Sequence, residues 1–262
     1  MPLFLMLSLF QAFERYQVSA HNQGLSYACV AIVKGVDALR INPAALGLLS
    51  KNIVGFGYEY TFAHTEGLQN IFAGFVRPLL KGGIGLGVSQ FGFAEQKENG
   101  ITTGLGLGLG KDFYFGTSGD LYLIQNKRTG TGVAYGINIG MLGILAKKWL
   151  LGVYGRNLNQ PQFGNAAVGT LPFSLQAGLG YKPFEDIVSE IDISVSDQTT
   201  CIYTSGAFAL LDFLNLRTGF KSAPVSLSFG FGVEYKNIKV DYAVEYLVDL
   251  PLNHTVSLSF DF

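Results

Sequence analysis

The sequence predicts an all-β fold, a fourteen-stranded antiparallel transmembrane β-barrel with an N-terminal plug that contains short helices. Hydrophobic residues alternate with small or polar residues, with a period of two, from about residue 53 to the end. Glycine (34 residues), Phe (21) and Tyr (13) are abundant, whereas only 14% of the residues are charged. No apolar run approaches the roughly 20 residues that a membrane-spanning helix needs. Any membrane crossing would therefore use strands.

Charge and cysteine content exclude several classes of function. The net charge is −1, without the basic surplus that nucleic-acid binding requires, so we expect no nucleic-acid partner. Cys29 and Cys201 lie far apart and belong to no spaced metal-binding motif. We expect neither a metal nor a cofactor.

The N-terminal fifty residues divide into two predicted parts. Residues 1–20 contain an apolar stretch followed by Val18-Ser19-Ala20, which is typical of a secretory signal peptide with a small-residue cleavage site. A short buried helix is the alternative for this stretch. Residues 21–50 form the predicted plug, because helix-period patterns appear only before residue 50. Residues 51–262 form the predicted barrel.

Fourteen segments carry the strand pattern, and turn residues separate them. Connections after even-numbered segments are tight, and most of those after odd-numbered segments are longer, as in outer-membrane barrels with short periplasmic turns and longer outer loops. The segments lie near residues 53–62, 68–79, 84–93, 101–110, 113–125, 132–145, 149–156, 171–181, 187–196, 201–210, 214–220, 225–235, 238–246 and 254–262.

The clearest pair of strands is residues 225–235 and 238–246. A two-residue turn at Lys236-Asn237 would pair Tyr235 with Ile238 and keep both apolar sets on one face. The same register sets Glu234 opposite Lys239, which is a favourable cross-strand pair. We therefore expect a tight hairpin here.

The composition of the second face distinguishes a barrel from a soluble β-sandwich. A sandwich would fill that face with charged and polar residues, whereas here many of its positions are glycine, as at Gly85, Gly106 and Gly178. Repeated glycine indicates that another segment packs closely against this surface, and a plug inside a barrel would do so. The apolar face would meet lipid, and residues 171–181 are expected to place Leu171, Leu175 and Leu179 on it.

The few polar side chains predicted for the lumen would anchor the plug rather than perform chemistry. They are Glu59, Arg77, Glu190, Asp192, Arg217, Glu234, Lys239, Asp241 and Glu245.

The last strand, "HTVSLSFDF", has its apolar face at Val256, Leu258, Phe260 and Phe262. A C-terminal strand that ends in Phe resembles the recognition signal by which bacterial outer-membrane barrels reach their insertion machinery. The resemblance implies two partners, that machinery and outer-membrane lipid.

The segment "GVDALRINPAALGLLSKNIVGFGY" resembles the N-terminal motif of the FadL-like superfamily, particularly its PorV/PorQ branch, at Asp37, Asn42, Pro43, Ala44 and Leu46. Asn is a good helix N-cap and Pro suits the first helical position, so Asn42 and Pro43 should begin a short helix that braces the plug. The resemblance implies a fourteen-stranded barrel with an N-terminal plug, which agrees with the strand pattern.

The sequence offers no catalytic motif. "GLGLGLGKD" departs from a phosphate-binding loop, because Asp112 stands where Ser or Thr is required. No Gly-x-Ser-x-Gly elbow is present, so we expect no enzyme.

Three functions remain open for a barrel in the bacterial outer membrane. The first is passage of small hydrophobic compounds through a plug-gated lumen, a substrate class that the resemblance implies. The second is a PorV/PorQ-like component of type IX-like secretion, which would receive secreted cargo proteins. The third is a purely structural barrel.

Overall fold

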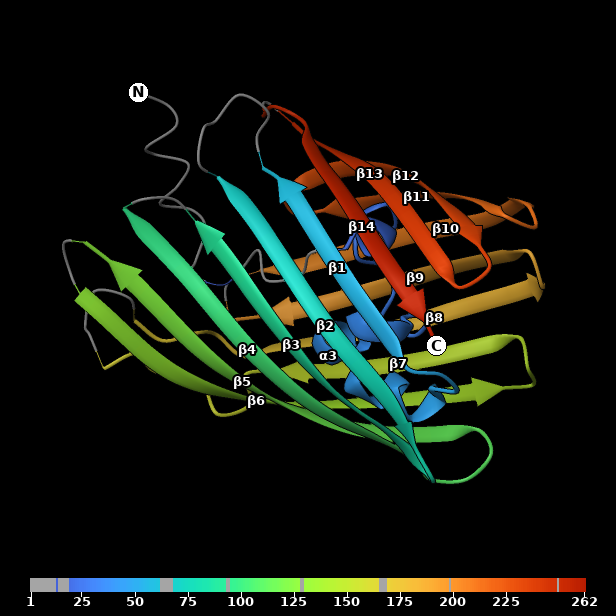
Figure 1. Cartoon of the computed structure of the whole chain (residues 1–262), viewed down its shortest axis with the longest axis horizontal. Helices are drawn as coiled ribbons and strands as arrows, with labels where there is room; N and C mark the ends of the chain where they lie inside the picture. Colours follow the sequence, from blue (N-terminus) through green and yellow to red (C-terminus); the bar gives the residue numbers. More distant parts are fainter. Residues whose placement is uncertain are drawn as a thin grey trace.

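The computed structural model describes residue 13 and residues 19–61, 68–92, 95–127, 130–164, 169–197, 199–248 and 250–262. These residues form a closed antiparallel barrel, in which every strand pairs with its neighbours along the chain and the first strand pairs with the last (Figure 1). The predicted fold class is confirmed. The strands are β1 (Ile53–Tyr60), β2 (Gln69–Leu79), β3 (Gly82–Gly92), β4 (Gln96–Gly108), β5 (Phe113–Asn126), β6 (Gly130–Leu145), β7 (Trp149–Arg156), β8 (Ser174–Phe184), β9 (Ile187–Ser196), β10 (Thr200–Leu211), β11 (Leu214–Ser222), β12 (Val225–Tyr235), β13 (Ile238–Leu247) and β14 (Asn253–Asp261).

Tight turns set the register of the wall. The connections after even-numbered strands are two to four residues long. At the turn between β12 and β13, Tyr235 pairs with Ile238 and Glu234 pairs with Lys239, as predicted. The Lys239 Nζ lies 3.1 Å from the Glu234 Oε2 at this turn. Short hairpins of this kind leave a strand little freedom to slip by one residue.

The barrel closes between β1 and β14, where Val54 pairs with Phe260. Beyond this ladder, the Phe262 N–H donates to the Asn52 carbonyl O (2.9 Å), and the Asn52 N–H donates to the Phe262 carbonyl O (3.1 Å). Closure leaves no strand edge with unpaired backbone groups, which hydrocarbon would penalise heavily.

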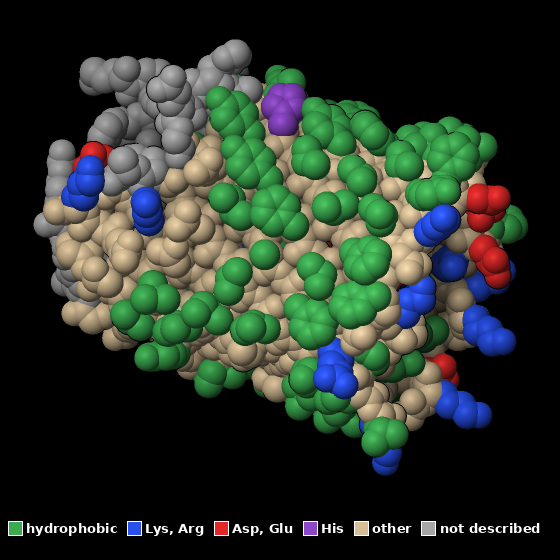
Figure 2. All heavy atoms as spheres, in the orientation of Figure 1, with side chains coloured by type: hydrophobic (Ala, Val, Ile, Leu, Met, Phe, Trp, Pro, Cys, Tyr) green, Lys and Arg blue, Asp and Glu red, His purple; other side chains and the backbone are tan. Residues whose placement is uncertain are grey.

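The two faces of the wall differ in chemistry. Outward side chains are apolar and exposed, and Phe229, for example, keeps 62% of its surface accessible. Figure 2 shows hydrophobic side chains spread over the middle of the visible face, with most of the visible Lys, Arg, Asp and Glu gathered at the end of the barrel that carries the short turns. Such an apolar belt is the surface that lipid covers in a transmembrane barrel.

The start of β8 differs from the prediction. The strand begins at Ser174 rather than near residue 171, and Leu171 is buried instead of facing outward. Residues 169–173 lie against residues 157–164, since the Leu171 N–H donates to the Pro161 carbonyl O (2.9 Å). Pro172 has no N–H for a strand ladder, which explains why pairing starts only after it.

The N-terminal residues form short helices inside the barrel (Figure 1). The helices are α2 (Ala20–Gln23), η1 (Gly35–Asp37), α3 (Ala38–Ile41) and η2 (Pro43–Leu48). Asn42 caps η2 through its side chain, with Pro43 at the first position, as predicted, although the helix is a 3₁₀ helix. None of the helices among the described residues is long and apolar enough to cross a membrane. The predicted signal peptide lies outside the described residues except for Phe13, Ser19 and Ala20.

Candidate functional site

The candidate site is the lumen of the barrel, which residues 19–50 enter; we call these residues the lumenal segment. Its helices contact the wall on different sides: α2 lies against β12, β13 and β14, η1 against β1 and β2, and η2 against β3 to β6. A segment that meets strands from all around a closed barrel lies within it.

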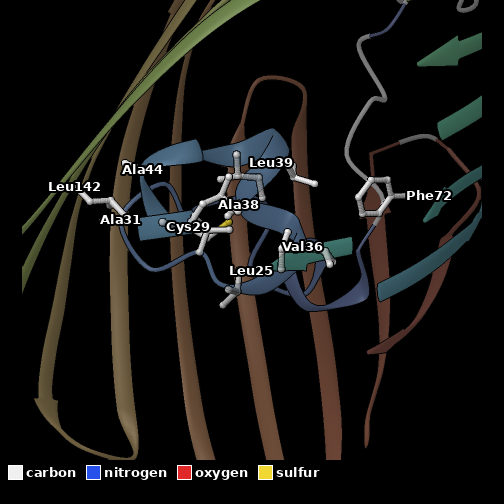
Figure 3. Packing of buried hydrophobic residues seen from close by; sticks show 14 residues of the cluster. Leu25, Cys29, Ala31, Val36, Ala38, Leu39, Ala44, Phe72 and Leu142 are labelled. Carbon is white, nitrogen blue, oxygen red and sulfur yellow. The ribbon is translucent and has the colours of Figure 1, made fainter. Parts of the chain in front are cut away.

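An apolar cluster forms the centre of the site (Figure 3). Leu25, Cys29 and Leu39 of the lumenal segment are fully or almost fully buried, and Phe72 of β2 and Leu142 of β6 extend this cluster into the wall. Burial of apolar side chains of this size stabilises packing by about 1.5–3 kcal/mol each. Hydrophobic burial therefore contributes to holding the lumenal segment in place.

Backbone of the lumenal segment approaches the glycines of the wall very closely. A Cβ atom on Gly152 of β7 would lie 2.5 Å from the Val30 carbonyl O, and one on Gly106 of β4 would lie 2.5 Å from the Pro43 carbonyl O. No real side chain tolerates such a distance to rigid backbone. These contacts account for the use of glycine on the inner face of the wall.

Asn42 joins three parts of the molecule from a fully buried position. Its Nδ2 donates to the Val30 carbonyl O (2.9 Å) and to the Met141 carbonyl O of β6 (3.0 Å). Its Oδ1 accepts from the Ala44 N–H (3.2 Å). One side chain thus caps η2, ties it to the preceding loop and fastens both to the wall.

The other residues of the predicted motif lie in the same segment. Pro43, Ala44 and Leu46 are buried in η2. Asp37 accepts a hydrogen bond from the Ser19 Oγ (2.8 Å). Burial of the Asp37 carboxyl raises its pKa to about 7, although the hydrogen bond from Ser19 acts in the opposite direction. The structure thus gathers the motif into one packed unit.

Two carboxyl groups of β9 bind the backbone of the lumenal segment. The Ala31 N–H donates to the Glu190 Oε1 (2.7 Å), and the Val30 N–H donates to the Asp192 Oδ2 (3.3 Å). Gln176 of β8 also donates to the Asp192 Oδ2 (2.8 Å). Glu190 and Asp192, which the sequence predicted as lumen groups, therefore lie where the prediction required.

Serine hydroxyls supply further anchors. The Ser205 Oγ of β10 donates to the Ala28 carbonyl O (2.6 Å), and the Ser26 Oγ donates to the Ser228 Oγ of β12 (2.9 Å). The sequence did not single these residues out, because serine at alternate strand positions is common on any polar face.

The remaining predicted lumen groups differ in their surroundings. Arg217 and Asp241 form a buried ion pair, with Nη1 to Oδ1 at 2.7 Å. Glu59 accepts from the Asn70 Nδ2 (3.3 Å), and Glu245 accepts from the Asn253 Nδ2 (3.0 Å), so both pair with a neighbouring strand. The predicted pair of Glu234 and Lys239 lies at the barrel end described above.

Arg77 was assigned to the wrong face. It is exposed on the outer side of β2, together with Phe75 and Leu79, whereas Val76 points inward and is fully buried. The side chain lies one residue before Pro78, close to the end of the strand. A long cationic side chain near a strand end can reach the membrane interface, so an outward position there is tolerated.

The C-terminal residues lie on the outer face as predicted. Val256, Leu258, Phe260 and Phe262 are all exposed. The Phe262 ring stacks with the Phe260 ring, with centroids 5.6 Å apart. Recognition of these residues by insertion machinery stays a prediction.

Sequence reasoning missed a second inner cluster, formed by Phe13, Tyr122, Ile124, Ala134, Phe163 and Leu171. A polar network adjoins it: the Tyr122 hydroxyl donates to the Asp120 Oδ2 (3.0 Å), to which the Asn138 Nδ2 also donates (2.7 Å). Inward polar positions alternate along β5 and could have indicated the network. The apolar contacts join residues far apart in the chain, and no local pattern reports them.

Across the residues that the structure describes, no group of His, Cys, Asp and Glu side chains is arranged to hold a metal ion.

No protein-family model and no curated protein matches the chain. Solved structures do match. CymD, a monoaromatic hydrocarbon channel, aligns with a TM-score of 0.71 and 14% identity over 96% of this chain and 99% of that chain. TodX, a toluene transporter of Pseudomonas putida, aligns with a TM-score of 0.68 and 14% identity over 91% of this chain and 98% of that chain. A FadL homologue of Pseudomonas aeruginosa aligns with a TM-score of 0.71 and 10% identity over 94% of this chain and 98% of that chain.

At these low identities the similarity shows a shared fold only. This chain itself has a closed fourteen-stranded wall and an apolar outer belt. Both features belong to barrels of the bacterial outer membrane. The chain is therefore an outer-membrane β-barrel with the fold of the FadL-family channels.

Proposed function

We propose that the chain lets small hydrophobic compounds cross the outer membrane, and that residues 19–50 act as a plug that controls their passage. The observation that carries the proposal is the way the lumen is filled: the segment inside it packs against the wall and is held by isolated side-chain hydrogen bonds, without a strand of its own in the sheet. Such a segment can move while the wall stays intact.

The energies of the anchors support a separable plug. Each hydrogen bond between the plug and the wall contributes about 0.5–1.5 kcal/mol net, whereas opening the wall would break whole strand ladders. Opening the plug would therefore leave the hydrogen-bond ladders of the wall intact.

The substrate class rests on the structural neighbours. CymD is a channel for monoaromatic hydrocarbons and TodX transports toluene. We transfer from them only the class, small hydrophobic molecules, because the lumen of this chain also contains an apolar centre. The proposal assigns no catalysis to the chain, and its expected partners are outer-membrane lipid and the insertion machinery.

A second candidate is a PorV/PorQ-like secretion component that receives cargo proteins. The motif at Asp37, Asn42, Pro43, Ala44 and Leu46 favours it, since the sequence there resembles that branch. Affinity purification of the chain from its native membrane would separate the two. Recovery of secreted proteins that share one C-terminal domain would support secretion, and their absence would support passage of small molecules.

Uptake of radiolabelled toluene tests the first proposal. Cells that carry a lipopolysaccharide outer leaflet provide the right barrier, because that leaflet slows small hydrophobic molecules that ordinary bilayers admit freely. Cells that produce the chain should take up toluene faster than cells with the empty vector, when the two samples have the same total cell surface area. Equal uptake, with the barrel shown to be folded in the outer membrane, would refute the proposal.

A further inference from the structure

The second inner cluster contains a slot that holds one aromatic ring. The ring of Phe13 lies between Tyr122 of β5, at a centroid distance of 4.7 Å, and Phe163, at 5.9 Å with an angle of only 9° between the planes. Only 4% of the surface of Phe13 is accessible. Ring pairs in this range of distances attract each other beyond the effect of burial alone.

The wall is shaped around this slot. A Cβ atom on Gly136 of β6 would lie 2.8 Å from the Cε2 of Tyr122, so the glycine lets that ring lie against the backbone. Ile124, Ala134 and Leu171 complete the apolar lining, and all three are buried. The slot therefore has apolar contacts suited to a flat ring.

Two charged side chains bind the polar atoms next to the ring of Phe13. Its N–H donates to the Glu98 Oε2 of β4 (2.6 Å), and its carbonyl O accepts from the Arg156 Nη2 of β7 (3.1 Å). Glu98 is itself buried, with 6% of its surface accessible. Hydrogen bonds to charged groups are stronger than those between neutral groups, so these two contacts favour a donor and an acceptor beside the ring.

We propose that this slot is a binding subsite for neutral aromatic compounds built like a phenylalanine residue, in which the carbon next to the CH₂ of the ring carries both an amide N–H donor and a carbonyl acceptor. The inference rests on the proposed function and narrows its substrate class. Phe13 occupies the subsite as an internal stand-in for the ligand. The sequence predicts that residues 1–20 are removed on export, and their removal would vacate the slot.

The charges explain why neither a plain hydrocarbon nor an aromatic acid fits as well. A bare ring such as toluene would make the stacking contacts but neither of the two hydrogen bonds. The carboxylate of N-acetylphenylalanine would bond to Arg156 and repel Glu98. N-acetylphenylalanine amide has the ring, the N–H and the carbonyl in the same covalent arrangement as Phe13, so it is the probe of choice.

Fluorine NMR of a ring-fluorinated N-acetylphenylalanine amide measures binding to the chain refolded in detergent, and the unlabelled compound as competitor separates binding from partition into micelles. A chain of residues 21–262 lacks both the ring and the backbone N–H and carbonyl of Phe13, whereas Phe13→Ala would leave those backbone groups on Glu98 and Arg156. We expect saturable binding to residues 21–262 that is at least about tenfold tighter than to the full chain with Phe13, because an occupied site must first release its occupant.

Three variants of the chain of residues 21–262 test the chemistry of the slot. Phe163→Leu should weaken binding about threefold to tenfold, since the loss of one aromatic pair corresponds to that range. Phe113→Leu makes the same exchange at a ring that is 58% exposed outside the slot, and should leave binding unchanged. Glu98→Gln should shift the preference from N-acetylphenylalanine amide towards N-acetylphenylalanine, an effect that a purely structural role of Glu98 would not produce.

The outcomes separate this inference from the channel proposal. Normal uptake of toluene by cells, together with binding that is not saturable or is equally weakened by Phe113→Leu, would overturn the subsite and leave the channel standing. Saturable binding with the expected effects of the variants, in a chain that admits no toluene, would support the subsite and overturn the channel.

Discussion

Asn42→Ala offers the sharpest test of how the plug is held. The side chain of Asn42 makes three hydrogen bonds, to the Val30 carbonyl O, the Met141 carbonyl O and the Ala44 N–H. At about 1 kcal/mol net for each bond, their loss should lower the free energy of plug opening by about 3 kcal/mol. A change of that size corresponds to roughly a hundredfold increase in the open population.

Hydrogen exchange measures this population directly. The Val33 N–H, which donates to the Cys29 carbonyl O (2.9 Å), reports on the plug. The Val54 N–H, in the strand that closes the barrel, reports on the wall. In Asn42→Ala the plug amide should exchange roughly a hundredfold faster, because exchange by local opening follows the open population, while the wall amide should not change.

Asn99→Ala is the matched control. Asn99 accepts one exposed hydrogen bond from the Gln90 side chain (2.9 Å) and lies away from the plug. Its loss should leave both amides unchanged. If Asn42→Ala left the Val33 amide as slow as before, or accelerated plug and wall equally, the view of a separately opening plug would be wrong.

Three further predictions concern the packing and the charges of the lumen. Gly152→Val should displace the plug and accelerate hydrogen exchange of the plug amides. Gly206→Val is the control, because a Cβ there would meet nothing within 4 Å, and it should not change this exchange. Equal effects of the two substitutions would contradict close packing as the reason for glycine at these positions. Arg217→Met should lower the free energy of unfolding, followed by gel mobility, by about 3–5 kcal/mol because Asp241 stays buried without its partner. Arg217→Met combined with Asp241→Leu should recover most of this loss, and a double variant as unstable as the single one would count against the ion pair. The carboxyl of Asp37 has a pKa of about 7 in the folded chain and an ordinary pKa near 3.9 when the plug is open. Between these values the closed form keeps a proton that the open form loses. The free energy that favours closure should therefore fall as the pH rises from about 4 to about 7, and should stay constant above that range. Asp37→Asn should remove that part of the pH dependence of plug exchange, and an unchanged profile would show that other groups cause it.

The strands could be predicted because their information is local. Period-two alternation is a property of neighbouring residues, and in a barrel of sequential hairpins each short turn fixes the register of the next strand, as at Lys236-Asn237. Glycine on the inner face also indicated that something packs there. The sequence did not show that the contact partner of Gly152 is the backbone at Val30.

The errors have equally physical causes. Arg77 was placed in the lumen because it is charged, although Phe75 and Leu79 share its face and place it outside. Leu171 continues an apolar alternation, but the hydrogen bond from its N–H to the Pro161 carbonyl O takes it out of the strand. The aromatic slot joins Phe13 to Tyr122 and Phe163, which come together only when the barrel closes around them.

A reversible tether between plug and wall tests the central claim, that the segment inside the barrel controls passage through it. The Ser26 and Ser228 hydroxyls lie 2.9 Å apart, so Ser26→Cys with Ser228→Cys should form a disulfide, which mass spectrometry can assign. Toluene uptake is then measured in cells that produce the double variant, before and after reduction, with Ser228→Cys alone as the control. Uptake at the level of the empty vector while the disulfide is closed, and at the level of the control after reduction, is the result expected. The same uptake in both states would contradict the claim.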